Sequence, residues 1–227
     1  MKKVLFLFLV YPLVGFAQLN SADEYIARRE KVLSMLDTSQ AIVLKAISYP
    51  PLANEYIQEH NFYYLTGINS PANILLMSPK GIFVGNKKKN SILFYSDFED
   101  VKNITLGQND TILKSAEFKA IFSKLLPKLN KLYYSAPDLI LVNDWLSDKV
   151  YFMDREMKNR LKTTYPSLKI EPAEFFVGKL RAIKSDQEIE YIRKASDITS
   201  DGLVAAMILA KPGVWENELQ AVIEYEY

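Results

Sequence analysis

Cysteine is absent from this 227-residue chain, and histidine occurs only once, at position 60. Without cysteine the chain can form no disulfide, no thiolate zinc site and no cysteine nucleophile. A single histidine excludes a metal site with two histidine ligands and an acid–base relay between two histidines. These two absences remove most of the common catalytic machinery from consideration.

An excess of charge of either sign is also missing. The chain has 28 Lys and Arg residues and 27 Asp and Glu residues, which gives a formal net charge of +1. A protein that binds nucleic acid normally carries a basic excess on its binding face, so we expect no nucleic-acid partner. The other proportions, 49% hydrophobic and 24% charged residues, are those of an ordinary globular protein.

The one long hydrophobic run lies at the N-terminus, where Val4–Phe16 follows a start with two lysines. Its 13 residues are too few for a membrane span, which needs about 20, and Pro12 and Gly15 interrupt it. A basic start, a short apolar stretch and small residues near its end are typical of a secretory signal. We predict that residues 1–17 form a signal peptide cleaved after Ala17, and that the protein is periplasmic or secreted without a stable membrane anchor.

Helical and strand patterns alternate along the rest of the chain. Ser21 and Ser185 each precede a glutamate by three positions, which is the capping-box arrangement at a helix start. Apolar residues at helical spacing and short β-branched apolar runs mark the other elements. Helices are expected over residues 21–36, 115–126, 150–161, 186–211 and from 216 onward, and strands over residues 41–46, 73–77, 81–84, 91–95, 131–135 and 168–170. This alternation favours an α/β fold with helices packed on a sheet.

Few side chains suggest catalysis or metal binding, and each has an ordinary explanation. His60 could act as a base, because histidine titrates near neutral pH. The sequence offers it no nucleophile and no second histidine, so a packed or surface histidine is the ordinary interpretation. Asp97, Glu99 and Asp100 follow a predicted strand, and they could bind a hard cation or form a solvated turn.

Two further groups of charged residues are expected to face solvent. Lys87–Lys89 lie between two predicted strands and are typical of a hairpin tip, with an anion site as the alternative interpretation. Four glutamates favour the solvent-exposed face of the last predicted helix: Glu216, Glu218, Glu224 and Glu226. From the residues alone, no active site is visible.

A distinctive block begins at Asn61. It reads Asn61-Phe-Tyr-Tyr-Leu-Thr-Gly67, and Pro71 and Ile74-Leu-Leu76 follow it. This block resembles the N-terminal domain of the Xaa-Pro aminopeptidases, which belong to the aminopeptidase P, prolidase and creatinase family. Gln58-Glu59 just upstream is similar to the Gln-Asp pair of that family. The residue before this pair is Ile57, where the family often has arginine.

A second block resembles the entry of the same family into its catalytic domain. It comprises Leu180-Arg-Ala-Ile-Lys-Ser185, Glu188-Ile189, Ile192-Arg193, Ala195, Pro212-Gly213, Glu216, Glu218-Leu219 and residues 221–227. The two blocks occur in the family's order and at about its spacing. The resemblance implies a mixed β-sheet flanked by helices over residues 18–176, of the creatinase and aminopeptidase P N-terminal type. It also implies the opening helices of an incomplete pita-bread metallopeptidase domain over residues 177–227.

The resemblance also implies an activity. In that family the catalytic domain holds two divalent ions, usually Mn²⁺, with two Asp, one His and two Glu, and it cleaves the peptide bond that precedes proline. The N-terminal domain narrows the active-site entrance and contributes to subunit contacts. A full-length form of this protein is therefore expected to act on proline-containing peptides and to form homo-oligomers.

No residue of this chain is assigned as catalytic or as a metal ligand, because the family's ligands lie downstream of the last predicted helix. The substrate-binding residues are unknown. We expect no metal ion bound to this chain and no activity from it alone. The alternatives are a non-catalytic domain for binding or oligomerisation, and a prolidase or creatinase-like hydrolase of the same family.

Overall fold

A computed structural model describes most of the chain. The chain divides into two compact units, Met1–Gly178 and Lys179–Tyr227, each of which is described by itself. The described residues are 21–47, 58–97, 101, 104–135, 141–144 and 149–226. The predicted signal peptide, residues 1–17, lies outside them, as do Glu99 and Asp100 of the acidic cluster.

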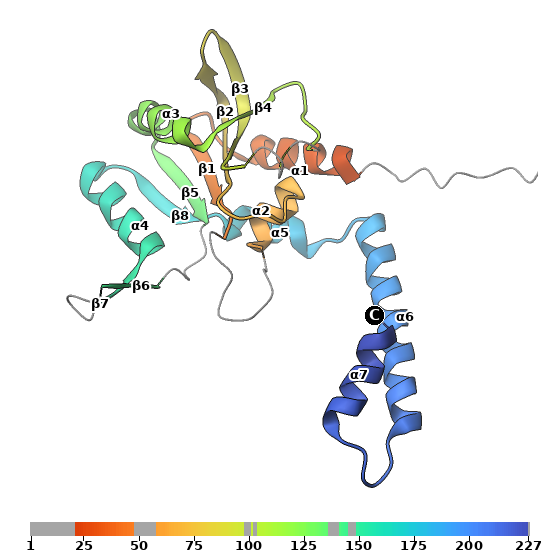
Figure 1. Ribbon diagram of the computed structural model, residues 1–227. Helices are drawn as coiled ribbons and strands as arrows, with labels where there is room; N and C mark the ends of the chain where they lie inside the picture. The colour runs from red at the N-terminus through yellow and green to blue at the C-terminus, as the bar shows by residue number, and fades with distance from the viewer. Residues whose placement is uncertain are drawn as a thin grey trace, which may run out of the picture. The chain divides into compact units, whose positions relative to one another are not determined.

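A six-stranded mixed sheet forms the centre of the first unit, in the order β4-β3-β2-β1-β5-β8 (Figure 1). Its strands are β1 (Gln40–Lys45), β2 (Ile74–Val84), β3 (Lys87–Tyr95), β4 (Asp110–Lys114), β5 (Lys131–Ser135) and β8 (Lys169–Pro172). β2 pairs antiparallel with β1 and β3, whereas β3–β4, β1–β5 and β5–β8 are parallel pairs. The carboxyl ends of β1, β5 and β8 therefore lie at the same end of the sheet.

Helices and a small second sheet complete this unit. The helices are α1 (Ser21–Met35), α2 (His60–Thr66), α3 (Phe118–Leu125), α4 (Met153–Thr164) and α5 (Glu174–Ala182), which ends in the second unit. Single 3₁₀ turns, η1 (Ser115–Glu117) and η2 (Leu126–Lys128), flank α3. β6 (Leu141–Asp144) and β7 (Lys149–Phe152) pair antiparallel. The predicted fold class, a mixed sheet with helices, is confirmed.

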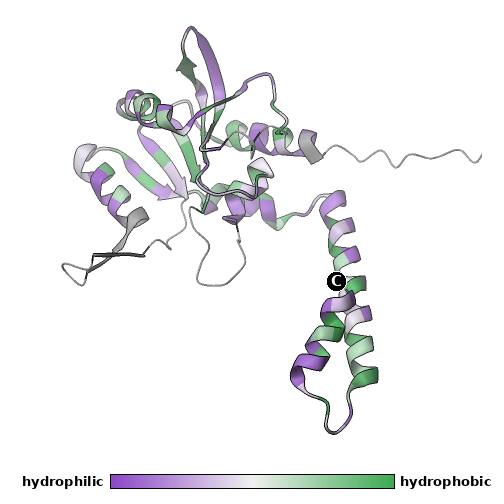
Figure 2. Cartoon of the chain, in the orientation of Figure 1, coloured by the Kyte–Doolittle hydropathy of each residue, from purple (hydrophilic) through white to green (hydrophobic). Residues whose placement is uncertain are grey.

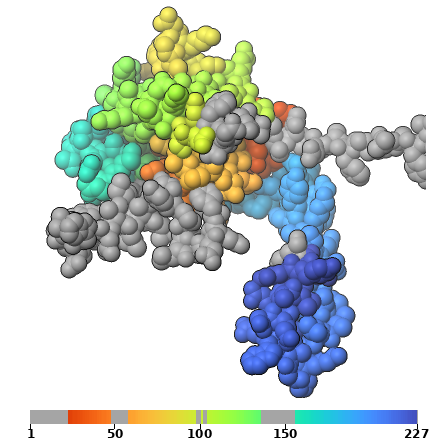
Figure 3. Space-filling model, in the orientation of Figure 1, coloured from red at the N-terminus to blue at the C-terminus, as the bar shows by residue number. Residues whose placement is uncertain are grey.

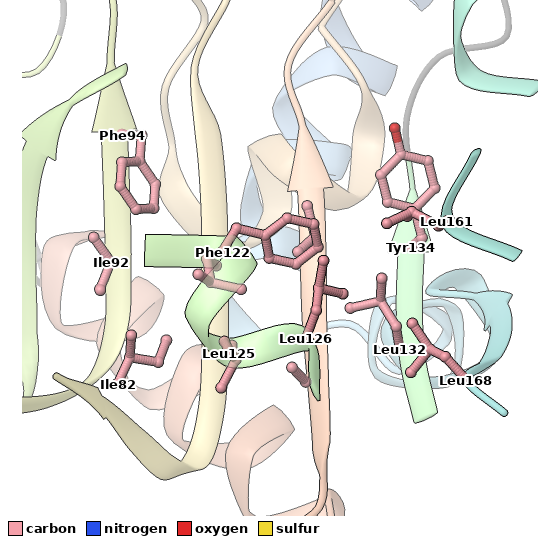
Figure 4. Packing of buried hydrophobic residues seen from close by; sticks show 13 residues of the cluster. Ile82, Ile92, Phe94, Phe122, Leu125, Leu126, Leu132, Tyr134, Leu161 and Leu168 are labelled. Carbon is pink, nitrogen blue, oxygen red and sulfur yellow. The ribbon is translucent and has the colours of Figure 1, made fainter. Parts of the chain in front are cut away.

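Apolar side chains of the central strands pack against α3 to form the core. β1 lies between two strands and is buried almost throughout, which explains its continuous apolar sequence. Helical spacing places Phe118 and Phe122 on one face of α3, where their rings stack at 4.9 Å, and Phe118 meets Phe94 of β3 edge-on at 5.2 Å. Figure 4 shows Phe122, Leu125 and Leu126 among the side chains of the strands.

A buried ion pair joins α1 to the start of β4. Arg29, 2% exposed, donates from Nε and Nη2 to Oδ2 of Asp110 at 3.2 and 2.6 Å. Its guanidinium also donates to the carbonyl oxygens of Leu65 at 2.8 Å and Thr105 at 3.3 Å. The backbone N–H of Gly107 donates to the same carboxylate oxygen at 2.8 Å. These contacts tie α1, the end of α2 and the loop before β4 together.

The strands predicted at residues 73–77 and 81–84 form the single strand β2, so that prediction was wrong in number. The pairing of β2 with β3 shifts register between Met77 and Ile82. Gly81 adopts a φ of +80° within this irregularity, a conformation open to glycine. The polar residues at 78–80 are accommodated inside the strand, although their sequence suggests a turn. The turn between β2 and β3 is shorter than predicted, because Lys87–Lys89 already belong to β3.

Other elements also differ from the sequence predictions. The helix predicted over residues 150–161 begins at Met153, because β7 occupies Lys149–Phe152. The helices α2 and α5 and the strands β4, β6 and β7 were not predicted. β4 is only five residues long, with charged residues at both ends, and it pairs with β3. The helix predicted over residues 115–126 corresponds to η1 and α3.

The second unit is a pair of helices, α6 (Asp186–Leu209) and α7 (Glu216–Glu226). The capping box predicted for α6 is confirmed: the N–H of Glu188 donates to Ser185 Oγ at 3.2 Å, and the N–H of Ser185 donates to Glu188 Oε2 at 2.9 Å. Gly202 faces Ile223 of α7, whose backbone oxygen would lie 3.4 Å from a Cβ at position 202. Within the described part of the chain, no helix has the length and apolar character needed to cross a membrane.

Candidate functional site at the carboxyl end of the parallel strands

Gln58 is a buried amide just before α2, 5% exposed, and its hydrogen-bonding capacity is fully used. Its Oε1 accepts from the backbone N–H groups of Ile47 at 3.0 Å and Glu59 at 2.9 Å. Its Nε2 donates to the carbonyl oxygens of Ile68 at 3.2 Å and Ser70 at 2.9 Å. A side-chain amide offers two donor hydrogens and two acceptor lone pairs. Gln58 therefore fixes the end of β1, the start of α2 and the loop after α2 relative to one another.

Glu59 and Asn61 connect α2 to two distant elements. Glu59 caps the N-terminus of α2, where its Oε2 accepts from the N–H of Phe62 at 2.6 Å. Glu59 Oε1 accepts from Asn61 Nδ2 and from Ser135 Oγ at the end of β5, both at 3.0 Å. Asn61 Nδ2 also donates to Glu174 Oε2 at 2.7 Å, in the first turn of α5. We call Gln58, Glu59, Asn61, Ser135 and Glu174 the polar network; α2 and α5 lie beside each other in Figure 1.

The sequence of α2 sets both of its ends. Glu59 is the N-cap, and Gly67 ends the helix with a φ of +70° and an N–H that donates to the carbonyl oxygen of Tyr63. A Cβ at position 67 would lie 2.5 Å from the ring of Tyr25, so glycine is required for space as well as for conformation. Phe62 and Leu65 are fully buried and anchor α2 in the core.

An aromatic cluster lies where α1 meets α2. The guanidinium of Arg28 lies 4.1 Å from the centre of the Tyr64 ring and donates to the Tyr64 carbonyl oxygen at 3.1 Å. Burial, together with the neighbouring Tyr63 and a hydrogen bond to it, raises the pKa of Tyr25 to about 12. The cluster holds the two helices together and keeps the Tyr25 phenol protonated.

The polar network positions elements and does not supply a catalytic pair. The carboxylates of Glu59 and Glu174 both accept from one amide, and the Ser135 hydroxyl donates to a carboxylate instead of facing a histidine base. An amide NH₂ between two carboxylates also opposes a cation there. Among the described residues, no three His, Asp or Glu side chains form a group that could hold a metal ion. These residues do not fit the two-metal centre that the resemblance implies.

The structure separates the other sequence candidates. His60 is exposed at the first position of α2, and Asp97 is exposed directly after β3. Lys87 and Lys88 are exposed at the hairpin, and Lys89 donates to the carbonyl oxygen of Gln108 at 2.8 Å. The prediction of a solvated face on α7 is confirmed, because all four of its glutamates are exposed: Glu216, Glu218, Glu224 and Glu226.

Sequence analysis reached only part of the polar network. Gln58, Glu59 and Asn61 were singled out because they belong to the family-like block. Ser135 was missed, although it ends a predicted strand, and functional side chains often gather at the carboxyl ends of parallel strands. Glu174 was missed because it lies in an unpredicted helix, 113 positions from Asn61, and no local signal connects the two.

Comparison with known proteins agrees with this architecture. Residues 25–128 match the family model described as "Aminopeptidase P, N-terminal domain". The Xaa-Pro aminopeptidase of Escherichia coli is 23% identical over 227 residues, covering 91% of this chain and 49% of that protein. Human Xaa-Pro aminopeptidase 3 is 25% identical and covers 91% of this chain and 44% of its own length. A structure of Zn-substituted E. coli aminopeptidase P in complex with product shares the fold, with a TM-score of 0.65 at 20% identity over 90% of this chain and 49% of that one.

The chain spans about half the length of these relatives. The matched residues 25–128 include β1–β4, α2 and three of the five residues of the polar network. The fold is that of the aminopeptidase P structures over most of the chain. On these grounds residues 25–128 form an aminopeptidase P N-terminal domain.

Proposed function

We propose that this chain is the N-terminal portion of an Xaa-Pro aminopeptidase, an enzyme that hydrolyses the bond between an N-terminal residue and a following proline. The observation that carries the proposal is the stretch Gln58–Gly67, which resembles the family and is built into the polar network of the domain. The E. coli and human relatives bear this activity in their names. The full-length form would use two divalent ions, usually Mn²⁺ in the family.

The catalytic centre is proposed to be built from residues outside this chain. The single histidine, His60, is exposed on α2, and the described residues offer no group that could hold a metal ion. Within the whole enzyme, this portion would border the active-site entrance and contribute to contacts between subunits. Alone, it is expected to bind no pair of metal ions and to release no N-terminal residue.

The test compares the 227-residue chain with the product of the longest reading frame that contains it. Both are assayed for release of alanine from Ala-Pro-Ala with Mn²⁺ and with EDTA. We expect Mn²⁺-dependent release from the longer protein and none from the shorter chain. Mn²⁺-dependent turnover by the shorter chain would contradict the proposal.

Two alternatives give different results in the same experiment. A reading frame that ends at Tyr227, with no activity, would support a non-catalytic binding domain. Cleavage of Ala-Pro but not of Ala-Pro-Ala would support a prolidase, and turnover of creatine would support a creatinase-like hydrolase.

Export is proposed as well, on the basis of residues 1–17. The mass of the protein recovered outside the cytoplasm should correspond to a chain that begins at Gln18. A Leu5→Asp, Leu7→Asp variant interrupts the apolar stretch and should remain in the cytoplasm with its N-terminus intact. Recovery of unprocessed protein outside the cytoplasm would argue against cleavage after Ala17.

A further inference from the structure

Part of β2 has an unpaired side. β1 pairs with β2 only over Ile74–Met77, whereas β3 accompanies β2 as far as Val84. From Ile82 to Val84, β2 therefore has β3 on one side and none of the described strands on the other. A strand with an unpaired side presents backbone N–H and C=O groups that another polypeptide can pair with.

A cavity of about 520 Å³ follows this unpaired side. The consecutive residues Lys80–Gly85 all line it. Successive side chains of a strand point to opposite faces of the sheet; Ile82 is 4% exposed and its neighbour Phe83 is 65% exposed, yet both border the cavity. A cavity bordered from both faces lies beside the strand. We call it the β2 groove.

η1 and α3 form the opposite wall of the β2 groove. Ala116 and Ala120 contribute small side chains that leave room, while Ile121 and Leu125 add an apolar surface. Figure 3 shows the atoms of the β2–β3 hairpin, in yellow, next to the green atoms of the segment that includes α3. The five strand residues Lys80–Val84 extend over roughly 16 Å, so the groove suits an extended segment better than a small ion.

The charge on the groove has one dominant sign. Lys80 and Lys88 line it from the hairpin, Lys124 and Lys128 line it from α3 and η2, and Glu117 is the one acidic residue of the lining. The whole chain carries a net charge of only +1, so this is a local concentration of positive charge. Such a concentration attracts and orients an acidic partner.

We propose that the β2 groove binds an extended acidic segment of another protein, which adds to β2 as a further strand. Main-chain hydrogen bonds to β2 would supply affinity, and alternate side chains would supply specificity. The apolar side chains of the segment would face Ile121 and Leu125, and its carboxylates would face the lysines. The site is separate from the polar network and does not depend on the proposed peptidase activity.

The test measures binding of fluorescein-labelled peptides to the full 227-residue chain by fluorescence anisotropy. The probe is Glu-Val-Glu-Val-Glu-Val, and two peptides serve as controls: Lys-Val-Lys-Val-Lys-Val and Glu-Val-Glu-Pro-Glu-Val. The acidic peptide should bind and the basic one should not. The proline peptide should bind at least tenfold more weakly, because proline removes a backbone donor. Equal binding of the proline peptide would overturn strand addition.

Matched lysine variants locate the site. Lys88→Glu and Lys124→Glu should each weaken binding about two- to fivefold, as expected for exposed ion pairs. Lys87→Glu and Lys119→Glu change the same charge on the same elements outside the groove lining, and they should alter binding less than twofold. Equal effects of all four variants would show general attraction and overturn the proposal. Circular dichroism confirms that each variant is folded.

A structural measurement identifies the occupant. Bound probe should slow amide exchange over residues 80–84, and the absence of such protection would count against strand addition. Sedimentation of the free chain tests for a second copy in the groove. If the chain self-associates and Lys88→Glu abolishes that association, the occupant is a second copy and the proposal is wrong.

Discussion

The carboxamide of Asn61 stands between the carboxylates of Glu59 and Glu174 and donates to both. Asn61 is 3% exposed, so a substitution there removes two hydrogen bonds from the interior. We predict that Asn61→Leu lowers the free energy of unfolding by about 2 kcal/mol, because the Glu59 and Glu174 carboxylates lose their shared donor. Urea unfolding measures the change. Asn159→Leu, at an exposed position of α4, is the control and should change the stability by less than about 0.5 kcal/mol. An equal loss of stability in the two variants would show that the polar network does not stabilise the fold.

The raised pKa of Tyr25 leads us to predict that the free energy of unfolding depends on pH in the alkaline range. Burial and Tyr63 raise its pKa from 10.0 to about 12 in the folded chain. Between these values the folded state retains a proton that the unfolded state has lost, so the free energy of unfolding falls as the pH rises from 10 to 12. Urea midpoints across this window should fall less steeply for Tyr25→Phe. Tyr191→Phe, on α6 and 58% exposed, should keep the wild-type slope, and an unchanged slope in Tyr25→Phe would contradict the assignment.

At the scale of elements, the start of α6 depends on one local motif. Ser185 and Glu188 each accept a hydrogen bond from the other's backbone N–H. We predict that Ser185→Ala destabilises the first turn by about 1 kcal/mol and speeds amide exchange at residues 186–189. Ser196→Ala is the control, because this serine lies within α6 and donates to the Ile192 carbonyl oxygen. Alanine favours a helix interior, so exchange should not speed up there, and a similar increase in both variants would contradict the capping role.

Helices and strands marked by a local sequence motif were predictable, whereas those that depend on pairing with a distant segment were not. The start of α6 is predictable from Ser185 and Glu188, which lie three positions apart and form a capping box. β4 pairs with β3, and its two β-branched residues, Thr111 and Ile112, form too short a run to predict a strand by themselves. β2 was divided in the prediction at residues 78–80, which include Pro79, while the structure accommodates them in a register shift. Sequence patterns carry local preference, and tertiary pairing overrides it.

The same distinction holds for the polar network. Gln58, Glu59 and Asn61 are neighbours in sequence, so one motif contains all three. Ser135 and Glu174 contact them only in the folded chain, across 76 and 113 positions of sequence. Contacts across such separations leave no local periodicity to detect.

At the scale of the whole molecule, apolar burial differs strongly between the two units. The first unit contains a continuous core of strand residues and α3. In the second unit, α6 buries only Gly202 and Ala206, and α7 buries none of its described residues. Met207 is 75% exposed, and Trp215 is 74% exposed. Figure 2 shows green, hydrophobic segments on the helices of this pair. Because apolar burial supplies most of the driving force for folding, the helix pair should be the less stable unit.

Hydrogen exchange tests this difference, with Gly202→Ala as the variant. In the wild-type chain, amides of residues 186–209 should exchange at least about 100-fold faster than those of β1, because elements with few buried contacts open at low free energy. Gly202→Ala should slow exchange in α6 and leave β1 unchanged. A Cβ there would meet the Ile223 backbone oxygen at 3.4 Å, an ordinary contact, and alanine stabilises a helix interior by up to about 1 kcal/mol relative to glycine. Equal protection of α6 and β1 in the wild type would show that the helix pair is as stable as the sheet. Faster exchange in Gly202→Ala would show that the approach of α7 leaves no room for the methyl group.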